Sequence, residues 1–263
     1  MSRPRALHRF DRAADTYHAA ADVQSAVASH LMELVKAIVP SLPAPSRILE
    51  IGAGTGVYSR LLRKHFPEAA VVVTDTSAAM LDRVRENVSG SDNLVTVLDR
   101  DGRLPVSGGF HLVTSSSALH WIPHLDRLSR RVAELLFPGG WFAFAMMVKG
   151  TLREIREAVM RIAPRKAHTR NLPDPHGVLR TVAASGLRLI HQELRGRQVT
   201  YPSTWEMLRR IHAQGVTGGI YGTRPPGLNR GELVRLQEYC DEKFAGPEGV
   251  RLSYRILYAV FCR

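Results

Sequence analysis

Cysteine is nearly absent from this chain of 263 residues, which contains Cys240 and Cys262 and no other. Two cysteines are too few for the disulfide framework of a small secreted domain or for a cysteine-rich zinc site. No stretch approaches the ~18 consecutive apolar residues of a membrane span. Residues 1–15 contain no apolar segment that would serve as a signal peptide. We therefore expect a soluble, reduced, cytoplasmic protein without a membrane partner.

Acidic residues are also few, because 24 Asp and Glu stand against 36 Lys and Arg, a formal net charge of +12. The excess is concentrated in residues 147–235, where 16 basic and 6 acidic residues leave +10, while the rest of the chain carries +2. Net charge bears on partners and not on fold. Nucleic acid, an acidic protein, an anionic small substrate and a merely solvated basic surface are all compatible with it.

The first half of the chain alternates short apolar runs with helical patterns. The expected strands are 47–51, 70–74, 94–98, 110–114 and 141–147, and the expected helices are 12–39, 57–65, 78–88 and 125–136. Apolar runs of this length are typical of buried parallel strands. Strands that alternate with helices predict a doubly wound α/β sheet, covered by helices on both faces.

After residue 147 this alternation stops. In the second half the expected helices are 151–162 and 203–212, the expected irregular stretches are 164–176 and 214–231, and the expected strands are 187–201 and 252–262. The irregular stretches are rich in Gly, Pro and Arg. We expect one sheet domain whose C-terminal half carries a helical elaboration.

The sharpest local pattern follows the first strand, where Glu50 precedes glycines at the alternate positions Gly52, Gly54 and Gly56. Glycine permits left-handed backbone angles and lets a ligand approach the backbone closely, and a helix N-terminus adds amide donors. Val57 stands where a dinucleotide fingerprint needs its third glycine, and no P-loop lysine follows. The pattern predicts a ligand-binding turn of another kind, although a structural glycine turn would look the same.

An acidic residue ends the second strand. Asp75 lies 19 residues after Gly56, a place where a carboxylate in a doubly wound sheet accepts hydrogen bonds from ribose hydroxyls. Asp75 is alternatively the N-cap of the helix that follows, a role that Thr76 or Ser77 would fill equally well. The position therefore predicts either a ribose ligand or a cap.

Carboxylates also follow the third strand. Asp99 and Asp101 flank Arg100 in this loop. A carboxylate at this edge of the sheet is suited to accept a hydrogen bond from an adenine amino group. The spacing leaves Asp99 and Asp101 both possible.

These motifs, in this order over residues 47–146, resemble the class I S-adenosylmethionine-dependent methyltransferases. The segment 136–140, Leu-Phe-Pro-Gly-Gly, is similar to the family's turn before strand five, and Met80 matches an apolar residue that packs on adenine. The resemblance implies a seven-stranded sheet with an antiparallel last strand and S-adenosylmethionine across the strand C-termini, which leaves S-adenosylhomocysteine as product. The residues that it assigns to the cofactor are Glu50, Gly52, Gly54, Gly56, Asp75, Thr76, Met80, Asp99, Arg100 and Ser115.

The segment after the fourth strand separates subgroups of this family. It lacks the Asn/Asp-Pro-Pro-aromatic motif of enzymes that methylate amino groups of nucleic-acid bases, and instead reads Ala118-Leu119-x-Trp121, as is common in small-acid methyltransferases. The flanks resemble the biotin-pathway malonyl-acyl-carrier-protein O-methyltransferases. The segments that carry this resemblance are 10–24, 115–121, 150–154, 170–173, 208–217 and 228–257.

The resemblance implies an expected division of the chain into an N-terminal helical cap (1–40), a cofactor-binding core (41–150), substrate-side helices and a lid (151–250), and a last strand (251–263). It also implies methyl transfer to the free carboxylate of a malonyl thioester. A carboxylate that is already ionised needs no general base. Catalysis then depends on positioning and on removal of water from the carboxylate.

A cationic clamp suits this chemistry, because an Arg fork pairs both carboxylate oxygens. Arg209 is the first candidate, with Arg210 and Arg170 as others. The residues expected to line the acceptor site or act there are Tyr17, His120, Trp121 and Arg209, and no metal site is expected.

The expected partner is an acidic acyl-carrier protein bearing a malonyl thioester, with the basic segment facing it. Three alternatives stay open: a methyltransferase of a free small acid such as trans-aconitate, a nucleic-acid methyltransferase, and a cofactor-binding module without turnover. The basic charge supports the second, and the absent Pro-Pro motif opposes it.

Overall fold

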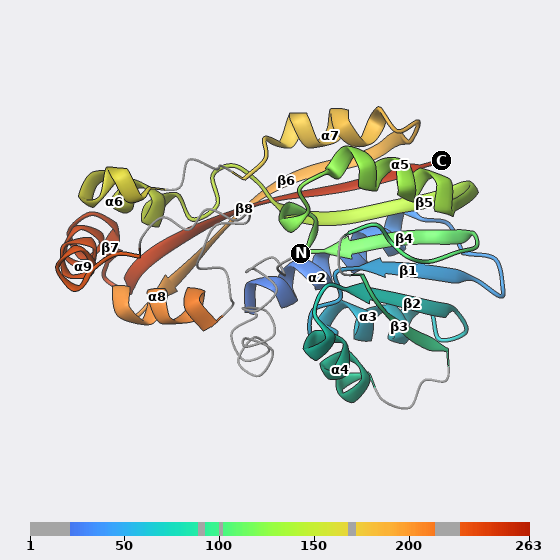
Figure 1. The fold of residues 1–263 in the computed structure, drawn as a ribbon, viewed down its shortest axis with the longest axis horizontal. Helices are drawn as coiled ribbons and strands as arrows, with labels where there is room; N and C mark the ends of the chain where they lie inside the picture. The colour runs from blue at the N-terminus through green and yellow to red at the C-terminus, as the bar shows by residue number, and fades with distance from the viewer. Residues whose placement is uncertain (1–21, 89–92, 100–101, 168–171, 214–226) are drawn as a thin grey trace, which may run out of the picture.

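A computed structural model describes residues 22–88, 93–99, 102–167, 172–213 and 227–263 (Figure 1). The strands are β1 (Arg47–Ile51), β2 (Ala70–Asp75), β3 (Leu94–Leu98), β4 (Phe110–Ser116), β5 (Leu136–Met147), β6 (Arg188–Tyr201), β7 (Ala245–Gly246) and β8 (Gly249–Cys262). The α-helices are α2 (Asp22–Ile38), α3 (Val57–His65), α4 (Ala78–Asn87), α5 (Leu125–Leu135), α6 (Arg153–Ile162), α7 (Pro175–Ala183), α8 (Thr204–Ala213) and α9 (Arg230–Phe244). Short 3₁₀ turns are η1 (Leu119–Trp121) and η2 (Pro164–Lys166).

The described strands form one sheet in the order β3-β2-β1-β4-β5-β8-β6. The first five are parallel, and β8 runs antiparallel to both β5 and β6. This confirms the expected doubly wound sheet with an antiparallel last strand. The two-residue β7, which pairs with the start of β8, adds a short strand to the expected seven.

Helices cover both faces of the sheet because the strands are apolar on both sides. Ile48 of β1 packs in the cluster that contains the buried residues of α2, α3 and α4. Its neighbour Leu49 points to the opposite cluster, with α5 and α7. Alternation along a strand sends successive side chains to opposite faces, so the two cores lie back to back (Figure 1).

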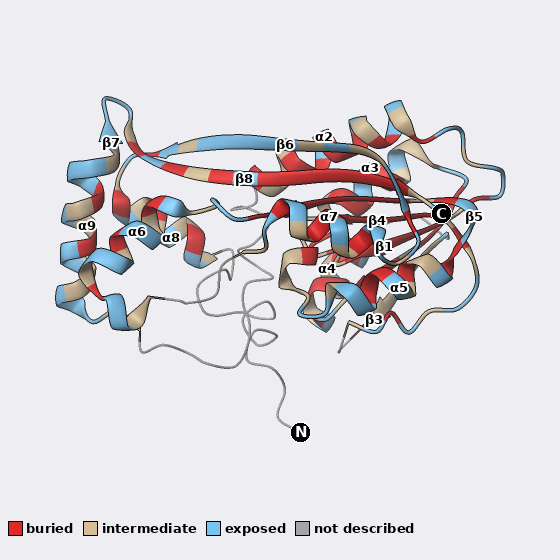
Figure 2. Cartoon of the chain, turned by 90° about the horizontal axis from the view of Figure 1, so that it is seen from above, coloured by how far each residue is buried: buried red, intermediate tan, exposed pale blue. Residues whose placement is uncertain are grey.

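Beyond the parallel strands, β6 and β8 continue as a long antiparallel ribbon. Their pairing runs from Arg188–Cys262 to Tyr201–Val250, and the far end of the ribbon carries α6, α8 and α9 (Figure 1). Figure 2 shows that β8 is buried along much of the ribbon whereas β6 is largely exposed. The helical elaboration thus stands apart from the helices that cover the parallel sheet.

The structure adds helices that the sequence patterns did not predict. Helix α7 overlaps the end of the stretch 164–176, and α9 begins at Arg230, inside the stretch 214–231. Residues 136–140 also differ from expectation, since they form the irregular start of β5, with a register shift against β4. No helix among the described residues is long and apolar enough to cross a membrane.

Candidate active site

The glycine turn after β1 adopts the geometry that its composition predicts. Gly52, Gly54 and Gly56 have φ angles of 72°, 54° and 86°, which are left-handed and unfavourable for other residues. The N–H of Gly52 donates to the carbonyl of Thr74 at 2.8 Å, which holds the turn against the end of β2. A Cβ on Gly52 would lie 2.2 Å from the Cβ of Ala118. The turn is therefore packed directly against the segment that follows β4.

Asp75 ties this turn to the next helix. Its Oδ2 accepts a hydrogen bond from the Gly54 N–H at 2.9 Å, and its Oδ1 accepts one from the Ser77 N–H at 2.9 Å. Ser77 is the N-cap of α4, since its hydroxyl accepts from the N–H of Met80 at 3.2 Å, while Thr76 is exposed. The half-buried Asp75 carboxylate therefore connects the glycine turn to the start of α4.

Glu50 is buried behind the turn, with 1% of its surface exposed. Its Oε2 accepts a hydrogen bond from the Ser59 hydroxyl at 2.5 Å. Burial raises the pKa of Glu50 to about 8, an effect that the hydrogen bond from Ser59 opposes and the nearby charge of Asp75 reinforces. The raised pKa favours the protonated form of Glu50, and a cationic ligand group beside it would favour the ionised form.

Asp99, at the end of β3, is also buried. Its two carboxylate oxygens accept hydrogen bonds from the N–H groups of Arg103 at 3.0 Å and Leu104 at 3.1 Å. The carboxylate thus shapes the loop after β3. Arg100 and Asp101 lie outside the described residues, so the choice between the two carboxylates stays open.

Ser115, near the end of β4, and Ser117, just after it, have different environments. Ser115 is buried, and its hydroxyl donates to the carbonyl of Ile51 at 2.8 Å, which joins the ends of β1 and β4. Ser117 has a φ of 59°, a strained value for this residue type. Its hydroxyl is buried and has no hydrogen-bond partner among the described residues. An orphaned hydroxyl in a strained turn, beside the glycine turn, is typical of a ligand-binding position.

His120 lies next to this turn. Its Nδ1 accepts a hydrogen bond from the N–H of Met147, at the end of β5, at 3.4 Å. An acceptor Nδ1 places the proton of the neutral ring on Nε2. The surrounding protein lowers the pKa of His120 to about 3, although the residue keeps some exposure to solvent. With the Trp121 ring 5.1 Å away, His120 presents a neutral N–H donor near the strand ends.

The expected cationic clamp is not brought to these strand ends. Arg209 lies on α8, with a side chain that is 76% exposed and an ion pair to Glu206 at 2.9 Å. Arg210 pairs with the same carboxylate at 3.2 Å, and α8 packs on α9, β6 and β8. Tyr17 and Arg170 lie outside the described residues. Met80, in contrast, lies in the first turn of α4, fully buried.

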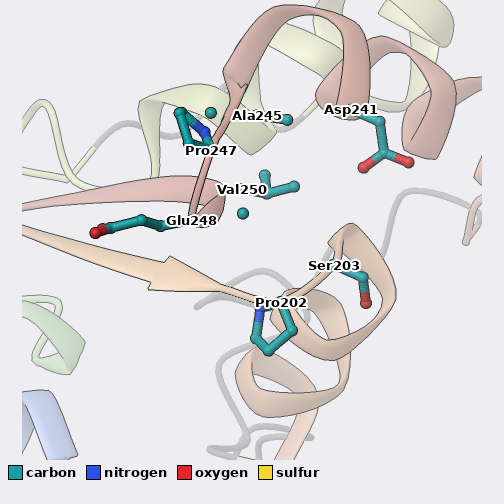
Figure 3. A pocket seen from close by; sticks show the side chains of 9 residues that line it. Pro202, Ser203, Asp241, Ala245, Pro247, Glu248 and Val250 are labelled. Atoms are coloured by element: carbon teal, nitrogen blue, oxygen red, sulfur yellow. The ribbon is translucent and has the colours of Figure 1, made fainter.

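A hollow of about 560 Å³ lies at the tip of the ribbon, on other elements than the glycine turn (Figure 3). Pro202 and Ser203 line it from the end of β6, and Asp241 and Val250 line it from α9 and β8. It contains none of the expected site residues. Among the described residues, no group of three or more His, Cys, Asp or Glu side chains is arranged to hold a metal ion.

Sequence reasoning missed Ser117 and Ser59. Ser117 was distinguishable from its serine neighbours only through its backbone angle and its lack of a partner. Ser59 lies nine residues after Glu50, in the first turn of α3, a position that gives no signal until the helix is docked. Ser59 places its hydroxyl beside Glu50, in β1, and Ser117 places its hydroxyl just after the end of β4.

Comparisons with known proteins agree with this arrangement. Residues 49–142 match the family described as a methyltransferase domain. The chain is 29% identical to a malonyl-[acyl-carrier protein] O-methyltransferase of Geobacter sulfurreducens, over 99% of this chain and 98% of that one. It is 30% identical to the enzyme of the same name from Chlorobium phaeovibrioides, over 97% and 94%. A solved methyltransferase structure from Bacillus halodurans has a TM-score of 0.62 at 14% identity, over 89% and 98%, and shows the shared fold.

Proposed function

The chain belongs to the family of malonyl-[acyl-carrier protein] O-methyltransferases, and we propose that it methylates the free carboxylate of a malonyl thioester held on a carrier protein. S-adenosylmethionine is the methyl donor, and S-adenosylhomocysteine and the methyl ester are the products. The observation that carries this proposal is the contact between two turns. The glycine turn packs against the turn after β4, in which the buried Ser117 hydroxyl has no partner among the described residues. Such a pair of turns forms a ligand cradle at the carboxyl ends of parallel strands.

The residues at this edge fit the methyl donor. The left-handed turn through Gly52, Gly54 and Gly56 leads into the N-terminus of α3, where backbone amides suit an anionic ligand group, and we assign Asp75 to the ribose hydroxyls. We assign Thr76 to direct contact, while Asp99 and Ser115 act by fixing the surrounding backbone, since their side chains bond within the chain. When bound, S-adenosylmethionine supplies an electrophilic methyl group on a sulfonium centre.

Glu50 adds an electrostatic element on the donor side. Burial raises its pKa to about 8, which disfavours its charged form in the free protein. A positive charge on the ligand stabilises the ionised form of a nearby carboxyl. We therefore assign Glu50 to charge compensation, and its hydrogen bond from Ser59 holds the carboxyl in place.

On the acceptor side, the malonyl carboxylate is ionised at neutral pH and loses no proton when it is methylated. The protein therefore has to orient the carboxylate and exclude water, not remove a proton. We assign this role to the Ser117 hydroxyl and the Nε2–H of His120, with Trp121 as an apolar wall.

Arg209 stays our proposal for the cationic clamp. Its present partner, Glu206, forms an exposed pair, and exposed ion pairs contribute only about 0–1 kcal/mol. Exchange of this partner for a substrate carboxylate is therefore energetically inexpensive. Tyr17 is proposed to cover the site from the N-terminal segment, as the family resemblance implies.

The test is intact-mass measurement of malonyl-carrier protein incubated with the enzyme and S-adenosylmethionine. We expect a mass gain of one methyl group, which the unacylated carrier does not show. Free malonate and trans-aconitate are assayed in parallel. Methylation of a free diacid without methylation of the carrier thioester would overturn the proposal in favour of a small-acid methyltransferase.

A further inference from the structure

A basic hollow of about 380 Å³ lies where β5 leads into α6. Arg153, Arg156 and Met160 lie at spacings of three and four residues, which places them on one face of α6. The complete lining, which we call the α6 hollow, is Lys149, Gly150, Thr151, Arg153, Arg156, Glu157 and Met160.

The charge of the α6 hollow is positive and largely uncompensated. Lys149 and Arg156 are exposed and have no side-chain partner within the described part of the chain. Arg153 pairs with Glu154 at 3.1 Å but keeps 67% of its side chain exposed. The one lining carboxylate, Glu157, is already bound by Lys243 and by the Tyr239 hydroxyl. The hollow therefore attracts anions.

An apolar side chain sits beside these cations. Met160 is 50% exposed. Its flexible thioether is well suited to pack against an apolar surface of a partner. A rim of charge around an apolar contact is the usual composition of a protein-binding surface. A nucleic acid would instead favour an extended row of cations that follows successive phosphates.

The hollow is built on a fixed platform. The carboxylate of Glu154, which is buried, accepts hydrogen bonds from the Ser253 N–H at 3.0 Å and from the Ser253 hydroxyl at 2.5 Å. These bonds anchor the first turn of α6 to β8. The Thr151 hydroxyl donates to the carbonyl of Arg255 at 3.0 Å, so the lining loop is attached to the same strand.

The hollow also lies close in the chain to the reaction centre. Lys149 comes two residues after Met147, whose N–H donates to His120. Since β5 is the neighbour of β4 in the sheet, the hollow begins at the same edge of the sheet as Ser117 and His120, the proposed hydrogen-bond donors to the substrate carboxylate. A partner bound there is placed to direct a flexible acyl arm toward Ser117 and His120.

We propose that the α6 hollow is the docking surface for the carrier protein, which binds it through an acidic segment and the phosphodiester at the root of its prosthetic arm. This inference rests on the proposed function. Lys149, Arg153 and Arg156 supply the charge complementarity, and Met160 supplies the apolar contact. Electrostatic complementarity of this kind acts mainly on association and specificity.

The test reverses two charges of the hollow with Lys149→Glu/Arg156→Glu, a pair that leaves the Arg153–Glu154 contact intact. The control is Arg161→Glu, which is exposed on the same helix but does not line the hollow. We expect the double variant to raise the Kd for malonyl-carrier protein and lower kcat/KM at least about tenfold, because like charges then face each other. Turnover of a malonyl thioester of a small thiol should be unchanged, and the control should match the parent protein within about twofold.

The outcomes separate the two proposals. Equal carrier affinity in the double variant and the parent protein overturns the docking surface while leaving the reaction intact. A parallel loss on the small thioester also overturns it, because the substitutions then act on the active site itself. If the parent protein methylates neither thioester, the proposed function fails, while the direct Kd measurement still reports on docking. Displacement of the carrier by a short single-stranded RNA of equal affinity assigns the hollow to nucleic acid instead.

Discussion

The contact between Gly52 and Ala118 gives a prediction whose size follows from the structure. Gly52→Ala places a left-handed backbone angle on alanine, which costs roughly 1–2 kcal/mol. It also drives a Cβ to 2.2 Å from the Ala118 Cβ, and overpacking of this kind costs typically about 1–3 kcal/mol. We therefore expect the free energy of unfolding to fall by about 2–5 kcal/mol, the sum of these two effects.

A matched control separates the two contributions. Gly139 has a φ of 77°, close to the 72° of Gly52, but an added Cβ there meets nothing within 4 Å. Gly139→Ala should therefore cost only the backbone part, roughly 1–2 kcal/mol. In the Gly52→Ala background, Ala118→Gly should restore the packing part, about 1–3 kcal/mol, as a coupling energy in a double-mutant cycle.

The assay is urea unfolding of the four variants and the parent protein, followed by calorimetric titration with S-adenosylhomocysteine. Gly52→Ala should weaken ligand binding as well as stability, because the same turn forms the cradle, whereas Gly139→Ala should leave the affinity unchanged. Equal destabilisation by Gly52→Ala and Gly139→Ala, with no recovery from Ala118→Gly, would refute the argument that the two turns are packed against each other.

Three further predictions concern the site. Asp75→Asn should weaken S-adenosylhomocysteine binding about tenfold or more, through loss of charge-assisted hydrogen bonds; Asp82→Asn, on the exposed side of α4, serves as the calorimetric control. Ser117→Ala should lower kcat/KM for malonyl-carrier protein about tenfold without changing S-adenosylhomocysteine affinity, and an unchanged rate would remove Ser117 from the acceptor site. Folding raises the pKa of Glu50 to about 8, so the folded chain binds this proton more tightly than the unfolded chain does. The protonated Glu50 therefore contributes fully to stability below about pH 4.5. This contribution is lost as the pH rises to about 8, by about 1.4 kcal/mol per pH unit. Glu50→Gln should remove that slope in unfolding measurements, and an identical slope in both proteins would contradict the assignment.

The sequence predicted the parallel half of the sheet closely because its strands are short apolar runs, and the first three are each followed by a glycine turn or end beside a carboxylate. The bounds of β1, β3 and α3 agree with the apolar runs and the glycine turn. Helix α9 was missed even though Asn229 and Glu232 form a capping box at its start. Its described core contacts are few, with Leu236 and Cys240 buried, so the helical periodicity is weak.

Within the site, residue types located the strand ends but not the hydrogen-bond partners. Ser115 and Ser117 are chemically identical in the sequence, yet one bonds across the sheet and the other has no partner in the described structure. The backbone decides this difference, because Ser115 lies within β4, whereas Ser117 lies in the turn after it with a left-handed φ angle. For Arg209, the spacing of three residues predicts the ion pair with Glu206. The sequence did not predict that α8 lies on the β6–β8 ribbon, away from the strand ends.

The location of the transferred methyl group tests the central claim most directly. After reaction with malonyl-carrier protein, the prosthetic arm is released and fragmented by tandem mass spectrometry to locate the added methyl group. We expect one methyl on the terminal carboxyl oxygen, as an ester that mild base removes, and we expect this methyl to be absent when Asp75 and Ser117 are both replaced. A methyl on any other atom, or an unmodified arm when a free diacid in the same mixture is methylated, would contradict it.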